Sequence, residues 1–342
     1  MDLSILWFFI VGVFLVGYFV LDGFDFGVGM AMPFISKDDT DRRVVINTIG
    51  PVWDLNETWL IVAGACLFAA FPEWYATMFS GFYLALLLIL VALIVRGVSF
   101  EYRHQGKGAQ WTGWFDRAIV FGSFLPPLLW GTAFASLLQG VPIEKMDNGG
   151  WLFTGTLLDL LTPYALLGGV TLMLLCFVHG AVFVALKSDG EIRVRARGLA
   201  TKVGLAAIVA GAAFLGWTLM LRLDHEYLGI MIALAGLAAA ALILAWVANL
   251  RGREGWAFTG NAAAIAFALL TIFMGLFPNL MISSTDPAYT MSISGAASSQ
   301  GTLELMTWVA VFTMPLVLAY QAWTYWVFRK RVSRANIPVA AH

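Results

Sequence analysis

Two pairs of acidic residues interrupt apolar stretches near the start of the chain. Asp22 and Asp25 lie in DGFDFGVGM, and Asp54 and Glu57 lie in WDLNETWL. The acids of each pair are three residues apart, so on a helix they share a face. A charged carboxylate inside a bilayer is costly unless it is paired, hydrated or protonated. Because carboxyl groups can take up and release protons, the two pairs are candidates for a proton or cation pathway.

The composition predicts a membrane around these acids. The 342 residues are 60% hydrophobic and 12% charged, with a mean hydropathy of +0.82. A spanning helix needs about 20 apolar residues, whereas the short alternating segments of a β-barrel are not evident. The sequence therefore predicts an all-α integral membrane protein that forms one domain over 1–342. Nine transmembrane helices are expected at roughly 4–34, 44–71, 74–95, 116–139, 157–186, 199–221, 227–248, 256–277 and 303–328.

The distribution of Lys and Arg predicts the orientation of these helices. Eighteen of the 20 basic residues, Lys107 among them, lie in alternate connectors and in the tail 329–342, and only Lys145 and Arg222 lie in the other set. Because cytoplasmic loops collect positive charge, we expect the C-terminus in the cytoplasm. Nine crossings then put the N-terminus outside. Topology and anionic lipid headgroups explain the basic loops, and the net charge of −1 argues against nucleic acid as a partner.

Helix geometry places both acidic pairs near the cytoplasmic edge of the hydrocarbon. At about 1.5 Å per residue, Asp22 and Asp25 lie roughly 27–32 Å from the outer start of the first helix. Asp54 reaches a similar depth when counted back from the outer end of the second helix. Pro51 lacks an N–H, so it should kink or start that helix just before Trp53 and free carbonyls beside the acids.

A structural role for some of these groups stays open. One of Asp22 and Asp25 could sit at the headgroup boundary or hydrogen-bond a helix end. Arg96, at the end of the third predicted helix, could partner Asp54 or Glu57, or could anchor its helix at the interface. A purely structural role for the acids differs from a proton pathway only in what mutation of Asp54 and Asp25 does.

Five blocks carry a family resemblance over nearly the whole chain. They are GYFVLDGFDFGVGM, RRVVINTIGPVWDLNETWL, FLPPLLWGTAFASLLQGVP, PYALLGGVTLMLLCFVHGAVFVALK and SGAASSQGTLELMTWVAVFTMPLVLAYQAWTYWVF. In order and spacing they resemble subunit II of the cytochrome bd-type quinol oxidases, including the cyanide-insensitive relatives. The resemblance implies two four-helix bundles plus a ninth helix. It also implies a respiratory complex of the bacterial cytoplasmic (inner) membrane that oxidises quinol, reduces dioxygen to water and is electrogenic because it draws protons from the cytoplasm.

The resemblance also implies where the cofactors lie. In the family two haems b and one haem d reside in the partner, subunit I, which also holds most of the quinol site. Small single-helix accessory subunits, and a lipid or structural quinone within this chain, are compatible with it. The residues agree that this chain ligates no haem iron, because several haems need several axial ligands. His179 is the only histidine within a predicted helix, His342 being the last residue, and we expect a hydrogen-bonded structural role for His179.

The resemblance assigns a proton pathway and no catalytic residue to this chain. The Asp of the family's GFDFG motif falls on Asp25. The motif WDGNEVWL falls on Trp53 and Asp54, with Asn56 and Glu57 also matching. In the family the acid at the Asp54 position is implicated in a proton path toward the haems of subunit I.

The predicted pathway residues are Asp54, Asp25, Glu57, Asp22, Trp53 and Asn56. Two positions depart from the family pattern, since Leu55 stands where Gly is usual and Thr58 where Val is common. Leu55 adds bulk beside the acid.

A cation- or proton-coupled secondary transporter is the competing class. Paired acids in glycine-rich helices suit such carriers as well. Transporter sites usually lie near the midplane between inverted repeats, whereas these acids cluster at the inner edge and no internal repeat is evident. The position of the acids therefore favours the oxidase subunit.

Overall fold

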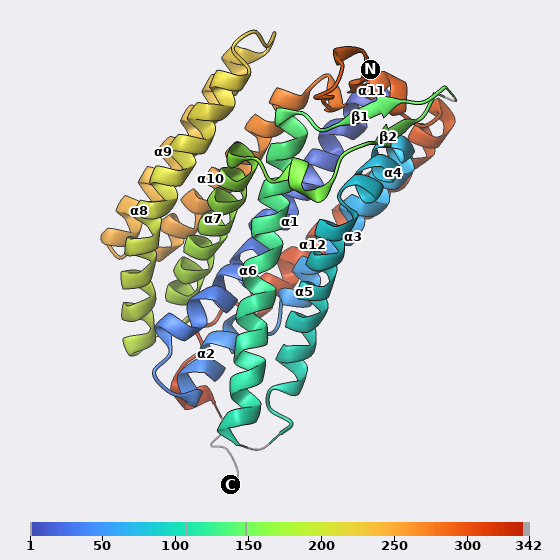
Figure 1. Cartoon of the computed structure of the whole chain (residues 1–342). Helices are drawn as coiled ribbons and strands as arrows, with labels where there is room; N and C mark the ends of the chain where they lie inside the picture. Colours follow the sequence, from blue (N-terminus) through green and yellow to red (C-terminus); the bar gives the residue numbers. More distant parts are fainter. Residues whose placement is uncertain (1, 107, 148, 338–342) are drawn as a thin grey trace.

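The computed structural model describes residues 2–106, 108–147 and 149–337, which form a bundle of long helices (Figure 1). Lys107, His342 and the rest of the tail beyond residue 337 lie outside the described residues. The first half contains α1 (Leu3–Ile35), α2 (Asp39–Ile49), α3 (Trp53–Ala70), α4 (Pro72–Gly81), α5 (Tyr83–Tyr102) and α6 (Ala109–Gln139). The second half contains α7 (Pro163–Lys187), α8 (Gly190–Leu221), α9 (Leu228–Leu250), α10 (Glu254–Leu276), the short α11 (Ile293–Ala296) and α12 (Gln300–Val327).

Nine crossings fit the described part of the chain. Eight of its helices are long and apolar enough to span a bilayer, and α2 with α3 makes a ninth if this bent pair is one span. The bend between α2 and α3 is 45°. It falls at Pro51, as the sequence predicts, because proline cannot donate the backbone hydrogen bond that a continuous helix requires.

The third predicted span, 74–95, is wrong at both ends. Residues 72–81 form the separate helix α4, with Pro72 in its first turn, and the span itself is α5. Proline is well suited to start a helix because its missing N–H has no partner there. Hydropathy did not distinguish the two helices, since both are apolar.

The spans form two groups of four, with the little-buried α12 as the ninth. One group is α1, α3, α5 and α6, and the other is α7, α8, α9 and α10; α1 packs against both. The crossing of α1 and α7 is very close at Gly27 and Gly180. A Cβ at Gly27 would lie 1.9 Å from the carbonyl oxygen of Cys176, so only glycine permits this approach.

Short irregular elements cover the end of the bundle where α6 and α10 terminate. Strands β1 (Ile143–Lys145) and β2 (Trp151–Phe153) pair antiparallel, as do β3 (Asn279–Met281) and β4 (Met291–Ser292). The 3-10 turns η1 (Leu157–Leu160) and η2 (Pro287–Tyr289) lie beside them. The polar connector before α12 could either fold back or be mobile on sequence grounds. It folds back, since Ser298 donates its backbone N–H to the carbonyl of Ala70 at 2.9 Å.

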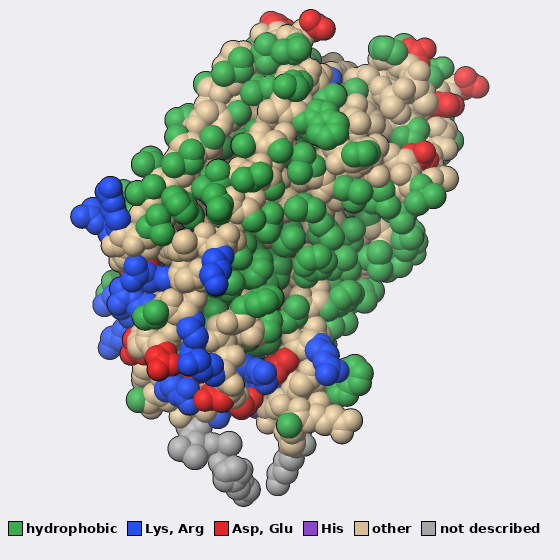
Figure 2. Space-filling model, turned by 60° about the vertical axis from the view of Figure 1, so that its left-hand side comes forward, with side chains coloured by type: hydrophobic (Ala, Val, Ile, Leu, Met, Phe, Trp, Pro, Cys, Tyr) green, Lys and Arg blue, Asp and Glu red, His purple; other side chains and the backbone are tan. Residues whose placement is uncertain are grey.

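Charge separates the two ends of the bundle. Lys and Arg side chains gather at the end where the described chain stops, whereas the opposite end shows mainly acidic groups (Figure 2). The first and the last described residues lie at opposite ends (Figure 1), which agrees with an odd number of crossings. We call the end that carries the Lys and Arg side chains the basic end.

The residues after α12, 328–337, form a tail segment that clamps the basic end and includes the 3-10 turn η3 (Arg334–Asn336). Val332 donates its N–H to the carbonyl of Lys187 at 2.7 Å. Arg334 pairs with Asp41 at 2.7 Å and with Asp38 at 2.8 Å. Asp41 is buried and also accepts a 2.5 Å hydrogen bond from Arg195 of α8. The tail segment thus ties the end of α12 to α7 and α2 directly, and to α8 through Asp41.

Candidate functional site

An arginine lies at the centre of the acids that the sequence singles out. The Arg96 side chain on α5 is fully buried, and its Nη2 contacts Asp22 Oδ1 at 2.8 Å and Glu57 Oε2 at 3.1 Å. The guanidinium also lies 4.2 Å from the ring centre of Phe26, a cation–π contact. The sequence offered Asp54 and Glu57 as partners of Arg96. The pairing with Glu57 is confirmed, and the pairing with Asp54 is wrong. Asp22 is a further partner that was not predicted.

Asp25 belongs to a second, adjoining set of hydrogen bonds. Its Oδ2 accepts from the Asn56 side-chain amide at 2.7 Å. The Asn56 oxygen accepts from Tyr325 at 2.7 Å and from Gln321 at 3.1 Å, both on α12. Gln321 in turn accepts from the Trp59 indole at 3.2 Å. Asp25 is therefore linked through one amide to the outermost helix of the chain.

Close helix packing brings these groups together. A Cβ on Gly122 of α6 would lie 2.7 Å from the Arg96 Cβ, so this glycine lets α5 approach α6 at the level of the arginine. On α1, Asp22 and Asp25 are three residues apart and have different partners. Asp22 binds Arg96, and Asp25 binds Asn56. Both carboxylates are fully buried within the protein.

The cluster holds more acid than base. Asp22 and Glu57 pair with the guanidinium of Arg96, and Asp25 lies beside them, three residues from Asp22. One arginine balances one carboxylate. Asp22 Oδ2, Asp25 Oδ1 and the Tyr18 hydroxyl have no hydrogen-bond partner in the described part of the protein. Buried excess charge of this kind is costly. The arrangement is therefore suited to bind protons, because protonation removes the excess charge.

Asp54 and Trp53 lie outside this cluster. Asp54 is exposed in the first turn of α3 and makes no hydrogen bond or ion pair with any described residue. Trp53 packs against Phe100, with ring centres 5.3 Å apart. Glu57, one turn further along α3, is 22% exposed and reaches Arg96. Asp54 thus lies on the surface of this chain, one helical turn from the buried acids.

Sequence reasoning missed Tyr18, Gln321 and Tyr325. Gln321 and Tyr325 are four residues apart on a largely apolar helix, so they share a face. That spacing was a usable signal. Their pairing with Asn56 was not predictable, since 265 and 269 residues separate the partners in sequence.

His179 is buried, and its imidazole ring contacts Val20 and Phe258. Its Nε2 lies 3.1 Å from the carbonyl oxygen of Val20, and its ring stacks on Phe258 with centres 4.4 Å apart. The expected hydrogen bond is confirmed. That the chain ligates no haem iron stays a prediction.

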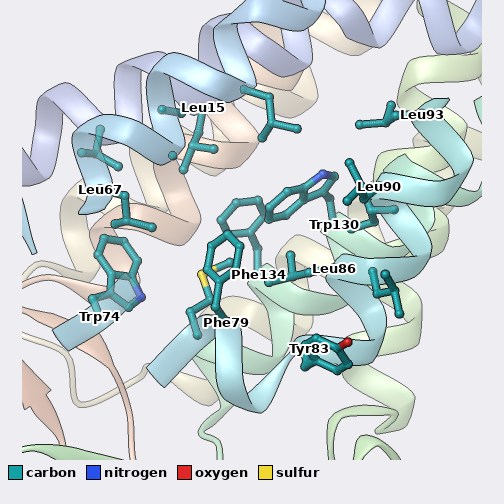
Figure 3. A pocket seen from close by; sticks show the side chains of 17 residues that line it. Leu15, Leu67, Trp74, Phe79, Tyr83, Leu86, Leu90, Leu93, Trp130 and Phe134 are labelled. Carbon is teal, nitrogen blue, oxygen red and sulfur yellow. The ribbon is translucent and has the colours of Figure 1, made fainter. Parts of the chain in front are cut away.

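An apolar cavity of about 320 Å³ lies within the first group of helices (Figure 3). Leu15, Leu67, Trp74, Leu90 and Phe134 contribute to its wall from five different helices, and all of them carry hydrocarbon toward it. Such a lining suits an apolar chain and offers almost no polar group for a headgroup.

The family model for cytochrome bd terminal oxidase subunit II matches residues 3–328. The chain belongs to this family. It is 41% identical over 329 residues to the cytochrome bd ubiquinol oxidase subunit 2 of Bacillus subtilis, covering 96% of each chain. It is 36% identical to the cytochrome bd-I ubiquinol oxidase subunit 2 of Escherichia coli, covering 99% of this chain and 98% of that one.

The fold is also that of a solved bd oxidase chain. A chain of the bd oxidase from Geobacillus thermodenitrificans superposes with a TM-score of 0.73 at 16% identity, covering 96% of this chain and 99% of that chain. This chain is therefore a multi-pass membrane subunit of a terminal oxidase. The family match does not support the transporter alternative.

Proposed function

We propose that this chain supports a haem-bearing subunit I in a quinol:dioxygen oxidoreductase and contributes buried acids to proton uptake from the cytoplasm. The observation that carries the proposal is the acid-rich cluster around Arg96. The names of the relatives from Bacillus subtilis and Escherichia coli support quinol as the reductant. Haem b and haem d belong, on this proposal, to subunit I.

The proton would be collected at the surface and passed inward. Asp54 lies exposed in the first turn of α3, and Glu57 lies one turn deeper and contacts Arg96. Asp22 and Asp25 hold the fully buried positions. Arg96 stabilises the charged form of its carboxylate partners, and the excess of acids lets the cluster accept a proton without further cations.

Subunit I would cover apolar surface on this chain. In α12 only Leu303, Gln321 and Thr324 are buried, while large apolar side chains such as Phe312 and Leu316 are exposed. In lipid such faces associate by close packing. The apolar cavity of Figure 3 would hold hydrocarbon, from a lipid or from the tail of a quinone.

Replacement of Asp54 tests the proton pathway. Asp54→Asn keeps the size of the side chain and removes the titratable group, so quinol oxidation should fall by roughly 10-fold or more with normal haem content. Asp25→Asn should cause a weaker loss and Asp22→Asn a still weaker one. The double variant Asp54→Asn/Glu57→Gln should be the most severe. Glu101→Gln, at an exposed acid near the basic end, is the matched control.

Two results would contradict this pathway. If Asp54→Asn keeps full turnover and proton uptake, the acids are structural. If it abolishes assembly, they belong to the interface with subunit I, and the protons must travel through that subunit alone. Expression of this chain without its partner tests the haem assignment, since stoichiometric haem on the isolated chain would refute it.

Reporter fusions test the proposed orientation in the bacterial inner membrane. Fusions after Arg253 and after Arg334 should report a cytoplasmic position, because both residues lie in the basic set of connectors. A fusion within residues 284–301 should report an external position. An external C-terminus would contradict both the orientation and the count of nine crossings.

A further inference from the structure

Two adjoining cavities open at the basic end, and no acid of the cluster lines either of them. The first has a volume of about 370 Å³ and lies between the α2–α3 break, α7, α10, α12 and the tail segment. The second has a volume of about 570 Å³ and lies at the start of α10. Leu186 and Arg331 line both, so the cavities adjoin at these two residues.

The walls of the cavities are largely apolar. Val52, Phe183, Phe258 and Phe328 line the first cavity. Trp256 lines the second and is 71% exposed. Tryptophan concentrates at the level of lipid headgroups because its ring is apolar and its N–H is polar. Such walls favour a ligand that carries hydrocarbon chains.

Four cations surround the cavities, namely Lys187, Arg253, Arg329 and Arg331. Among the described residues, none of these four lies within 4.0 Å of a carboxylate oxygen. Three of them donate hydrogen bonds to backbone carbonyls, which carry no net charge: Lys187 to Phe328 and Lys330, Arg329 to Trp326, and Arg331 to Leu186. Arg329 also lies 4.4 Å from the ring centre of Trp326.

Other cations at the same end contrast with these four. Arg103, Arg195 and Arg334 each pair with aspartates. The carboxylate of Glu254, which lines the second cavity, is already occupied by Arg193 at 2.8 Å and lies 3.7 Å from Arg197. The cavities therefore carry positive charge that the described residues leave unbalanced.

We propose that the joined cavities bind an anionic phospholipid of the leaflet at the basic end. Its phosphate would sit among Arg253, Arg329 and Arg331, and the first carbons of its acyl chains would pack against the apolar walls. Basic pockets between helices at this level bind acidic lipid headgroups in other membrane proteins. The positive charge repels protons and metal cations, so this opening is unsuited to proton uptake. The apolar walls favour a lipid over free phosphate.

The bound lipid would brace the join between α12 and the rest of the chain. Tyr325 lines the first cavity and donates its hydroxyl hydrogen to Asn56, the partner of Asp25. The lipid would pack beside Phe328 and Arg331, which begin the tail segment. It would thus hold Tyr325 against Asn56 without touching an acid of the cluster.

Native mass spectrometry of the purified complex tests the proposal, after exchange of its lipids in detergent. The triple variant Arg253→Gln/Arg329→Gln/Arg331→Gln should retain phosphatidylglycerol or cardiolipin roughly 100-fold less well than the wild type, since each cation near the surface favours acidic lipid by about one kcal/mol. The control is Arg117→Gln/Lys202→Gln/Arg251→Gln, which removes the same charge from exposed positions that line neither cavity. The control should retain the lipid.

A second measurement uses the wild-type complex alone and covers the case in which the triple variant fails to assemble. Thermal stability in phosphatidylcholine nanodiscs should rise as phosphatidylglycerol is titrated in, and it should not rise with inorganic phosphate. Equal retention by the triple variant and its control would overturn the proposal. So would stabilisation by inorganic phosphate or by phosphatidylcholine to the same degree as by the acidic lipid.

Discussion

Helices α1 and α12 are both apolar enough to span a bilayer and have opposite surroundings. The most apolar window of α1 has a mean hydropathy of 2.5 and is 50% buried, whereas that of α12 has 1.7 and is only 6% buried. Lipid tails are as apolar as a protein interior, so hydropathy does not decide which helix is central. The difference lies in the small and polar residues. On α1, glycines such as Gly27 let neighbouring helices approach closely, and Asp22 and Asp25 form hydrogen bonds to α5 and α3. On α12, Gln321 and Tyr325 form the hydrogen bonds to Asn56.

The largest effect should follow substitution at the α1–α7 crossing. Gly27→Leu would force side-chain atoms into the backbone of Cys176 and Gly180, at 1.9 and 2.5 Å from the new Cβ. Backbone cannot rotate away, so the free energy of unfolding should fall by more than about 3 kcal/mol. The yield of assembled, haem-containing complex should collapse. Gly301→Leu on α12, where a Cβ meets nothing within 4 Å, is the matched control and should assemble normally.

The next largest effect should follow loss of the buried cation. Arg96→Gln leaves Asp22 and Glu57 without their counter-charge and should destabilise the complex by about 3–5 kcal/mol. Thermal unfolding followed by haem absorbance measures this. The double variant Asp22→Asn/Arg96→Gln should recover part of the loss, because no fully buried charge of that pair remains unpaired. Equal destabilisation of the single and double variants would show that the packing of Arg96, and not its charge, matters.

Changes on α12 should be milder. Tyr325→Phe removes one hydrogen bond to Asn56 and keeps the ring, so we expect a loss of about 1 kcal/mol and a small drop in quinol oxidation. Trp323→Phe, at a 58% exposed position four residues before the end of α12, is the control. A loss for Tyr325→Phe as large as for Arg96→Gln would mean that α12 is as central to the cluster as α1.

The smallest effect should be the pH response of the tail segment. The backbone N–H of Asp41 and then the Arg334 guanidinium lower the pKa of Asp38 below its ordinary value of 3.8. A lowered pKa in the folded state gives stabilisation that is complete above the ordinary value and is lost as pH falls through the lowered pKa. Fluorescence anisotropy of a label at Ala335→Cys should therefore fall in that acidic window. The added change Asp38→Asn should remove this step, and an unchanged step would assign it to another group.

The apolar and acidic patterns predicted much of this structure. Runs of apolar residues gave the spans, Pro51 gave the break between α2 and α3, and helix rise placed Asp25 and the α3 acids at one level. These features depend on local sequence. The start of α5 was missed because Pro72 begins a separate apolar helix that hydropathy merges with the span.

Which acid of the α3 pair enters the cluster was not predictable. A spacing of three places Asp54 and Glu57 on one face, but Glu57 reaches Arg96 whereas Asp54 stays exposed. The outcome depends on how far α3 is tilted at the break and on where α5 lies, and both are tertiary. The links from Asn56 to α12 likewise join segments far apart in sequence.

The clamp at the basic end also imposes an order on biosynthesis. Arg334 leaves the ribosome 293 residues after Asp41, the buried carboxylate to which it binds. Until then, of the two described arginines that pair with Asp41, Arg195 of α8 alone has been made. The end of α12 is also not yet tied to α7. A chain cut short before the tail segment would insert all its spans and still lack this last ion pair. The tail segment therefore docks only after α12 has been made, so this ion pair forms later than the contacts among the preceding helices.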